Sequence, residues 1–387
     1  MSSYSLDKSS LLSRLKELVA IESINPSLVE GGSGETLVAD YIVDQLDAIG
    51  ADITLQRFDS NRVNVIGVLR GDGDGQNLML NGHMDTVGTT GMEIDPFNPV
   101  YKDGKVFGRG AFDMKASLSA MLSVGEAFIQ SKEQLCGDLV LAFVADEEYG
   151  SRGTEELVKD FTADAAIVTE PTTLDVIIAH RGFAWARIDV LGRAAHGSLY
   201  NEGIDAIAKA GKILLAIEQL DLSFEQLPKH PLLQRGSVHA SLIKGGTELS
   251  TYPSNCRIEI ERRTLPSEDK KFVIDELSEL LSNIHDQDED FVAKSDVFFY
   301  RSGLQMDSDA DIVNQVIQSC KRSIGKHPEL IGAAWWTDAA LLFDAGIPSI
   351  LFGPSGEGAH AAVEYVEFES VIKAAAVLAD VALNFCK

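Results

Sequence analysis

The stretch NLMLNGHMDTV at residues 77–87 decides how this chain can fold. Its apolar half has the length and composition of a buried strand, and that strand ends in His83 and Asp85. Because side chains alternate along a strand, these two residues share one face. The pair could form a hydrogen-bonded turn, or it could serve a metal ion at the carboxyl end of the strand. Taken alone, the stretch leaves both interpretations open.

Patterns of two kinds alternate around this stretch. Residues 64–71 and 138–148 have the character of strands, whereas residues 34–50 and 115–129 have helical apolar spacing. This alternation predicts an α/β fold with a mostly parallel central sheet. The apolar runs at 138–148 and 165–171 also end in acidic residues. Ligand sites in such sheets gather outside the carboxyl ends of strands, so we expect these residues to lie together.

The pattern changes near residue 181. Strand-like segments and two helical segments predict an inserted α+β domain with a four-stranded antiparallel sheet and two helices. A chain of 387 residues is also longer than one hydrophobic core usually serves. We therefore predict a catalytic domain formed by residues 1–180 and 304–387, interrupted by a lid or dimerisation domain at residues 181–303.

Composition argues against two classes of partner. The formal net charge of −26 is unsuited to binding nucleic acid, whose phosphates require clustered Lys and Arg. No apolar run reaches the roughly 18 residues of a membrane span, and no secretory signal is visible.

The four cysteines are scattered along the chain without paired spacing. We expect reduced thiols and a cytoplasmic location.

Candidate metal ligands recur in five short motifs. They are His83 and Asp85 in GHMD, Asp113 in GRGAFDMK, Glu147 and Glu148 in DEEYGS, Glu170 in VTEP, and His360 in GEGAH. Each has an ordinary explanation on its own, such as a helix cap or a solvated charge near a helix start. Together, the histidines and carboxylates suit Zn²⁺ and exceed what one tetrahedral ion needs. Two ions that share a bridging carboxylate, with one further carboxylate as general base, account for the set.

These motifs, in this order, resemble those of the dinuclear zinc peptidase and deacylase family that includes acetylornithine deacetylase, succinyl-diaminopimelate desuccinylase, carboxypeptidase G and aminoacylase. The resemblance extends over nearly the whole chain, including VAIESINPS at residues 19–27. It implies two Zn²⁺ per subunit, with Co²⁺ or Mn²⁺ as possible substitutes. The implied ligands are His83 and Glu170 for one ion, Glu148 and His360 for the other, and Asp113 as the bridge.

The resemblance also implies roles beside the metals. Asp85 would orient His83, as metal-bound histidines usually require, and Glu147 would be the general base and then the acid. The peptide bond between Asp113 and Met114 is expected to be cis.

Further implied roles concern the substrate. His196 would reach the active site of a partner subunit and polarise the scissile carbonyl, which implies a homodimer through the inserted domain. Arg263 would bind a substrate carboxylate, and the neighbouring Arg262 should face the opposite side of its strand. The remaining substrate-binding residues predicted are Gly245, Gly246 and Thr337.

Some positions depart from the family pattern. Ser250 stands where many members have asparagine, and Trp335 and Trp336 stand where smaller residues are common. The two tryptophans could pack in the core or could form an aromatic wall for the substrate.

The sequence predicts an enzyme, a metal-dependent amidohydrolase that cleaves an amide next to a free carboxylate. The expected reaction is deacylation of an N-acyl amino acid of the acetylornithine type. A metallo-carboxypeptidase or dipeptidase acting on a short peptide is the alternative. A non-catalytic binding protein with the same fold is a remote alternative, because it would require the loss of a metal ligand or of the general base.

Overall fold

The computed structural model describes residues 5–59, 62–131 and 134–387, which form two units. The first unit contains Met1–Ile178, Met306–Ile331 and Thr337–Lys387, and the second contains Ala179–Gln305 and Gly332–Trp336. The segment Gly332–Trp336, which the sequence division assigns to the catalytic domain, belongs to the second unit. Among the described residues, no helix has both the length and the apolar character needed to cross a membrane.

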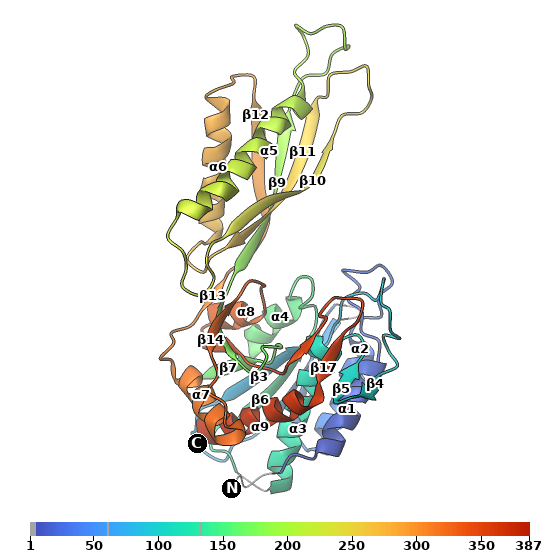
Figure 1. Cartoon of the computed structure of the whole chain (residues 1–387), viewed down its shortest axis with the longest axis vertical. Coiled ribbons are helices and arrows are strands. Elements are labelled where there is room, and N and C mark those ends of the chain that lie inside the picture. The colour runs from blue at the N-terminus through green and yellow to red at the C-terminus, as the bar shows by residue number, and fades with distance from the viewer. Residues whose placement is uncertain (1–4, 60–61, 132–133) are drawn as a thin grey trace. The chain divides into compact units, whose positions relative to one another are not determined.

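A mixed β-sheet forms the centre of the first unit (Figure 1), and its strands have the order β1-β2-β6-β3-β7-β15-β8. Its strands are β1 (Asp52–Asp59), β2 (Arg62–Leu69), β3 (Leu78–His83), β6 (Leu139–Val144), β7 (Ala165–Val168), β8 (Val176–His180) and β15 (Ser349–Leu351). The pairs β6–β3, β3–β7 and β7–β15 are parallel, whereas β1, β2 and β8 join antiparallel. The predicted α/β class is confirmed, and the four central strands β6, β3, β7 and β15 pair in parallel.

Helices cover both faces of this sheet. In β2, the Asn64 amide donates to the backbone carbonyl of Gly153 in α4 (Arg152–Asp160), whereas Gly67 lies against Leu46 of α2 (Thr36–Ala48). Residues an odd number apart in a strand point to opposite faces, so α2 and α4 lie on opposite sides. The other helices are α1 (Lys8–Ala20), α3 (Ala116–Ser131), α7 (Asp311–Ile324), α8 (Ala339–Asp344) and α9 (Phe368–Phe385). Helix α9 packs against both α3 and α7 (Figure 1).

A small antiparallel sheet in the same unit has the order β16-β17-β5-β4. Its strands are β4 (Val100–Lys102), β5 (Lys105–Phe107), β16 (Gly356–Glu357) and β17 (Tyr365–Glu367). The β16–β17 loop carries His360, and the segment after β5 leads to Asp113. Since β17 pairs with β5, with Val366 opposite Val106, this sheet brings two segments together that lie far apart in the sequence.

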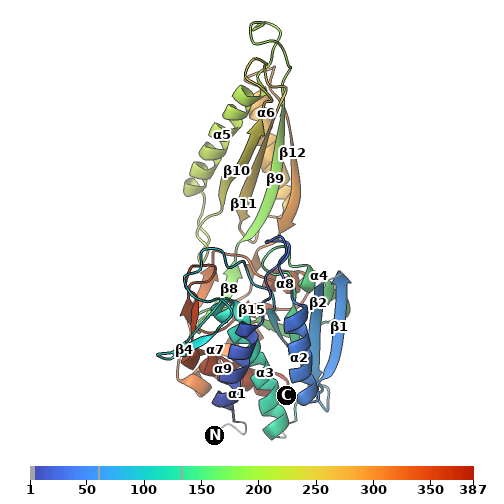
Figure 2. The same cartoon turned by 90° about the vertical axis from the view of Figure 1, so that its right-hand side faces the viewer.

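The second unit has the predicted form, a four-stranded antiparallel sheet with two helices. The sheet has the order β10-β11-β9-β12 (Figure 2), and α5 and α6 lie side by side on it (Figure 1). The elements are β9 (Gly182–Leu191), α5 (Ala206–Ser223), β10 (Ser237–Gly245), β11 (Asn255–Thr264), α6 (Lys270–His285) and β12 (Val292–Arg301). Side chains such as Ile213, Ile258 and Leu277 form the core between helices and sheet. Short strands β13 (Leu304–Gln305) and β14 (Leu330–Ala333) pair with β8.

Candidate metal centre

Candidate ligands follow three neighbouring parallel strands of the first unit. Strand β3 ends at His83, Glu148 follows β6, and Glu170 follows β7. The strand register places His83 opposite Val144, the last residue of β6. The carboxyl ends of β3, β6 and β7 therefore lie at one edge of the sheet, which is where open α/β sheets bind their ligands.

The structure brings five of the predicted residues into two groups that share one member. The groups are His83, Asp113 and Glu170, and Asp113, Glu148 and His360, and the ligand atoms of each group lie within 4.8 Å of one another. One oxygen of Asp113 lies 3.2 Å from Nε2 of His83, and the other lies 3.2 Å from Nε2 of His360. A carboxylate that offers one oxygen to each group has the arrangement of a ligand bridging two ions.

The chemistry of these groups fits divalent cations. Oε1 of Glu170 lies 3.5 Å from Nε2 of His83, and Oε2 of Glu148 lies 3.0 Å from Nε2 of His360. Burial, together with the charge of Asp113, raises the pKa of Glu170 to about 8 and that of Glu148 to about 7. Oε1 of Glu148 is buried and has no hydrogen-bond partner among the described residues. Imidazole nitrogens and carboxylate oxygens of this kind are the donors that zinc and similar metals take.

His83 is buried and held in one orientation by Asp85. Its Nδ1 lies 2.9 Å from the backbone carbonyl oxygen of Asp85 and 3.6 Å from the carboxylate of the same residue. Because a carbonyl oxygen only accepts, Nδ1 carries a proton and Nε2 is the nitrogen available to a metal. The carboxylate of Asp85 accepts instead from the backbone amides of Glu147 and Glu148.

Glu147 is a half-buried carboxylate that belongs to neither ligand group. Burial raises its pKa well above the usual range; the charge of His83 opposes this shift, and that of Glu170 adds to it. A carboxylate that is close to both ligand groups and outside them has the position expected of a general base.

The segment with Asp113 is fixed by two residues that the sequence analysis did not identify. Asp113 lies in a single irregular turn, η1 (Ala111–Lys115), and the peptide bond between Asp113 and Met114 is cis, as the family resemblance implied. The buried Glu364 carboxylate accepts hydrogen bonds from three backbone amides, those of Gly110 (3.0 Å), Phe112 (3.0 Å) and Asp113 (3.1 Å). It also pairs with Nη1 of Arg109 at 2.7 Å. The available signal was that Glu364 follows His360 by four residues and Arg109 lies in the GRGAFDMK motif.

The other predicted residues, except Thr337, lie in the second unit. His196 is exposed, and its Nδ1 accepts from the backbone amide of Ser198 at 3.2 Å. Arg263 is partly exposed and bonds Glu261, whereas Arg262 is buried against Glu276 on the other face, as the strand alternation predicted. Gly245 ends β10, and Gly246 has a φ of 73°, a conformation that favours glycine.

Three residues near the domain boundary differ in exposure. Trp336 packs edge-on against Phe183 and donates from its indole nitrogen to the carbonyl of Ser302. Of the two alternatives for the tryptophans, these contacts match packing against the protein. Trp335 is 51% exposed. Thr337 is buried, and its hydroxyl accepts from the amide of Ala339 at the start of α8.

The chain is similar to known proteins over most of its length. Residues 79–384 match the model of peptidase family M20/M25/M40. The chain is 29% identical to an acetylornithine deacetylase of Myxococcus xanthus, with 97% of each chain covered. It is 26% identical to an N-formyl-4-amino-5-aminomethyl-2-methylpyrimidine deformylase of Bacillus subtilis (strain 168), with 98% of this chain and 95% of the relative covered. The solved structure of aminopeptidase PepT from Bacillus cereus ATCC 10987 shares the fold, with a TM-score of 0.80, 19% identity and coverage of 99% and 100%.

Proposed function

This chain belongs to peptidase family M20/M25/M40, and from that premise we propose that it removes the acyl group from an N-acyl amino acid. In general terms, the chain is a metal-dependent amidohydrolase or peptidase. The observation that carries the proposal is the pair of ligand groups joined at Asp113, with Glu147 beside them. This arrangement is suited to hydrolysis by a water between two metal ions.

The proposed ligands follow the two groups. His83 and Glu170 would hold one ion, Glu148 and His360 would hold the other, and Asp113 would join both. We propose Zn²⁺ for both positions, with Co²⁺ or Mn²⁺ as substitutes on the same ligands. Asp85 would support His83 and the turn that carries Glu147 and Glu148.

The proposed mechanism assigns proton transfer to Glu147. Divalent ions held by these residues would supply the Lewis acidity that activates a water and polarises the substrate carbonyl. Glu147 would take a proton from the attacking water and give it to the departing nitrogen. Because Nδ1 of His196 accepts from the Ser198 amide, Nε2 carries the proton of the neutral ring and can donate to the developing oxyanion.

Substrate binding is assigned to the second unit. Nε of Arg263 donates to Glu261, which orients the guanidinium. This guanidinium would bind the free carboxylate of the substrate. Gly245 and Gly246 would approach the substrate with their backbone, and Trp335 is the exposed aromatic residue that could contact the acyl group or the side chain. The substrate role of Thr337 remains a prediction, because its side chain is buried.

A substrate panel with a chelator control tests this function. N-acetyl, N-formyl and N-succinyl amino acids and unblocked dipeptides would be compared as substrates. Each would be run with and without EDTA, and then after Zn²⁺, Co²⁺ or Mn²⁺ is restored. We expect the acyl amino acids to be hydrolysed faster than the dipeptides, with loss of activity in EDTA. A preference for dipeptides would favour the carboxypeptidase or dipeptidase alternative, and EDTA-insensitive turnover would contradict the metal-dependent mechanism.

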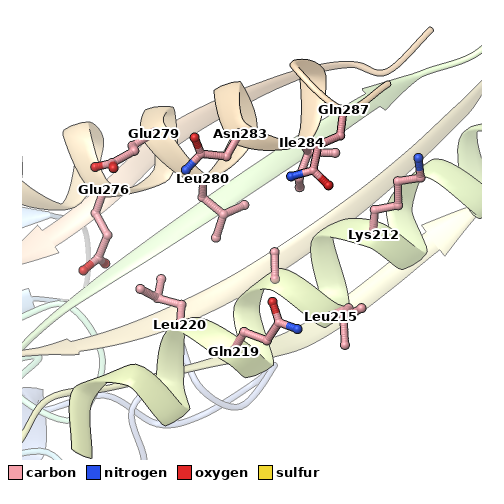
Figure 3. Close-up of a pocket in the computed structure, with 11 residues that line it drawn as sticks. Lys212, Leu215, Gln219, Leu220, Glu276, Glu279, Leu280, Asn283, Ile284 and Gln287 are labelled. Carbon is pink, nitrogen blue, oxygen red and sulfur yellow. The ribbon is translucent and has the colours of Figure 1, made fainter. Parts of the chain in front are cut away.

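We also propose a homodimer through the second unit. Leu242 (64%) and Ile243 (53%) are exposed on β10, which is an edge strand of the described sheet. A groove of about 610 Å³ between α5 and α6 presents further apolar side chains, among them Leu215 and Leu280 (Figure 3). Exposed apolar groups of this kind commonly mark contacts between subunits.

A cytoplasmic location is proposed as well, supported by four free cysteine thiols.

A further inference from the structure

Three consecutive backbone amides in the turn after β6 each donate to a buried carboxylate. The amide of Asp146 donates to Glu35 at 3.2 Å. The amides of Glu147 and Glu148 donate to the two oxygens of Asp85 at 3.2 and 3.1 Å. Asp146 has a φ of 69°, in the left-handed region that few residues other than glycine adopt. Surrounding contacts therefore have to hold this turn in shape.

Asn25 connects the two sides of the turn. Its amide nitrogen donates to Oδ2 of Asp85 at 2.7 Å and to Oδ1 of Asp146 at 3.0 Å. Its own side-chain oxygen accepts from Nη2 of Arg62 at 2.7 Å, which leaves the amide nitrogen facing the two carboxylates. Asn25 is fully buried, so water does not replace these bonds in the folded protein.

Arg62 neutralises the same cluster. Its guanidinium pairs with Glu35 and lies 3.0 Å from Asp146, and only 5% of the side chain is exposed. Buried carboxylates are costly unless they are paired and hydrogen-bonded. The planar fork of arginine reaches Glu35, Asn25 and Asp146 at once, which the single ammonium of lysine does not reproduce.

We propose that Asn25 and Arg62 are positioning residues of the hydrolytic site, acting through Asp85 and Asp146 on the turn that carries Glu147 and Glu148. This inference rests on the proposed function, because it takes Glu147 as the base and Glu148 as a metal ligand. Neither Asn25 nor Arg62 is assigned any contact with the substrate or the metals. Their loss should therefore misplace the two glutamates and leave the groups assigned to the substrate unchanged.

The test uses the full-length variants Asn25→Ala and Arg62→Lys. Arg14→Lys is the matched control, because Arg14 is likewise largely buried and ion-paired, with Glu126 at 2.7 Å, and its side-chain hydrogen bonds go to Gln45, Ser123 and Glu126, outside this turn. Steady-state kinetics would be measured on the best substrate. A Co²⁺ titration of the metal-free protein would be followed by visible absorption, which reports on the coordination that includes Glu148. Thermal unfolding would identify the folded variants.

We expect kcat to fall about 10- to 100-fold in both variants with KM changed less than about threefold, because misplacement of catalytic groups mainly affects the transition state. The Co²⁺ spectrum should change in both variants and stay as in the wild type for Arg14→Lys. If Asn25→Ala does not fold, the kcat and the Co²⁺ spectrum of Arg62→Lys decide whether the proposal holds.

Folded variants with the wild-type spectrum and unchanged kcat would overturn the proposal, even if their unfolding temperatures were lower. If the wild-type protein hydrolyses no amide, the proposed function fails, and the Co²⁺ spectra alone decide the positioning role.

Discussion

The carboxylate of Glu364 accepts a hydrogen bond from the backbone amide of Asp113 at 3.1 Å. Glu364 comes from the loop that carries His360, so one buried carboxylate joins the segments of two proposed ligands. The bridge position of Asp113 is thus fixed from outside the ligand groups, by contacts that span more than 200 residues of sequence.

Replacement of Glu364 should weaken metal binding. Glu364→Gln removes the charge that pairs with Arg109 and one of the two oxygens that accept the backbone amides. Residues that support metal ligands typically contribute 10- to 100-fold in affinity, so we expect a loss of about that size. Competition with a zinc-binding dye measures it, with Glu369→Gln on the exposed surface as control. Unchanged affinity would show that the loop keeps its shape without Glu364.

Glu147→Gln should separate metal binding from turnover. Glu147 lies outside both ligand groups, so the variant should bind two equivalents of metal like the wild type. Loss of a general base typically lowers kcat about 10²- to 10⁴-fold. Metal analysis and steady-state rates check both parts, and Glu156→Gln on α4 is a surface control. A rate near that of the wild type would remove Glu147 as the base.

Arg263→Ala should mainly affect substrates with a free carboxylate. Losing hydrogen bonds to a charged group costs about 1.5–3 kcal/mol, so kcat/KM should fall at least tenfold on such substrates. Carboxyl-amidated analogues should lose far less. Arg257→Ala is a matched control, because Arg257 lies an even number of residues away in β11 and pairs with Asp189. Equal losses on both kinds of substrate would argue against the carboxylate role.

A role for His196 in the partner's active site can be tested by mixing two inactive variants. His196→Ala and Glu147→Gln dimers would be combined under conditions that allow subunit exchange. If His196 acts across the dimer, hybrid dimers contain one intact site, and about a quarter of wild-type activity should return. Analytical ultracentrifugation would measure the oligomeric state in parallel. A fully active monomer, or mixtures with no recovered activity despite exchange, would contradict the proposal.

His180 should make stability depend on pH. Burial lowers its pKa to about 4, and its Nε2 has no hydrogen-bond partner among the described residues. The unfolded state, with a pKa near 6.5, binds the proton first as pH falls, so the folded state loses up to about 3 kcal/mol between pH 6.5 and 4. Urea unfolding across this range should show a smaller pH dependence in His180→Phe than in the exposed-site control His239→Gln. Identical slopes in both variants would contradict this assignment.

Much of the site could be predicted from sequence because its ligands end strands or lie in short motifs. The apolar runs before His83, Glu148 and Glu170 predict parallel strands, and the geometry of such sheets places their ends together. The supporting residues gave no comparable signal. Asn25 and Arg62 lie far from the ligands in sequence, and a single asparagine or arginine in a strand or loop has many ordinary roles. Glu364 lies only four residues after His360, but a lone glutamate in a loop is equally common.

The sequence by itself determined the class of fold, the inserted domain and the set of donor residues, since hydrophobic periodicity and motif order are local properties. The family resemblance implied that the donors divide into two groups at Asp113, and only the tertiary structure gives the distances between separate segments that form these groups. It also decided that the carboxylate of Asp85 accepts from the amides of Glu147 and Glu148, whereas its carbonyl orients His83. Backbone hydrogen bonds of this kind depend on the conformation of the turn, which residue identity alone does not specify.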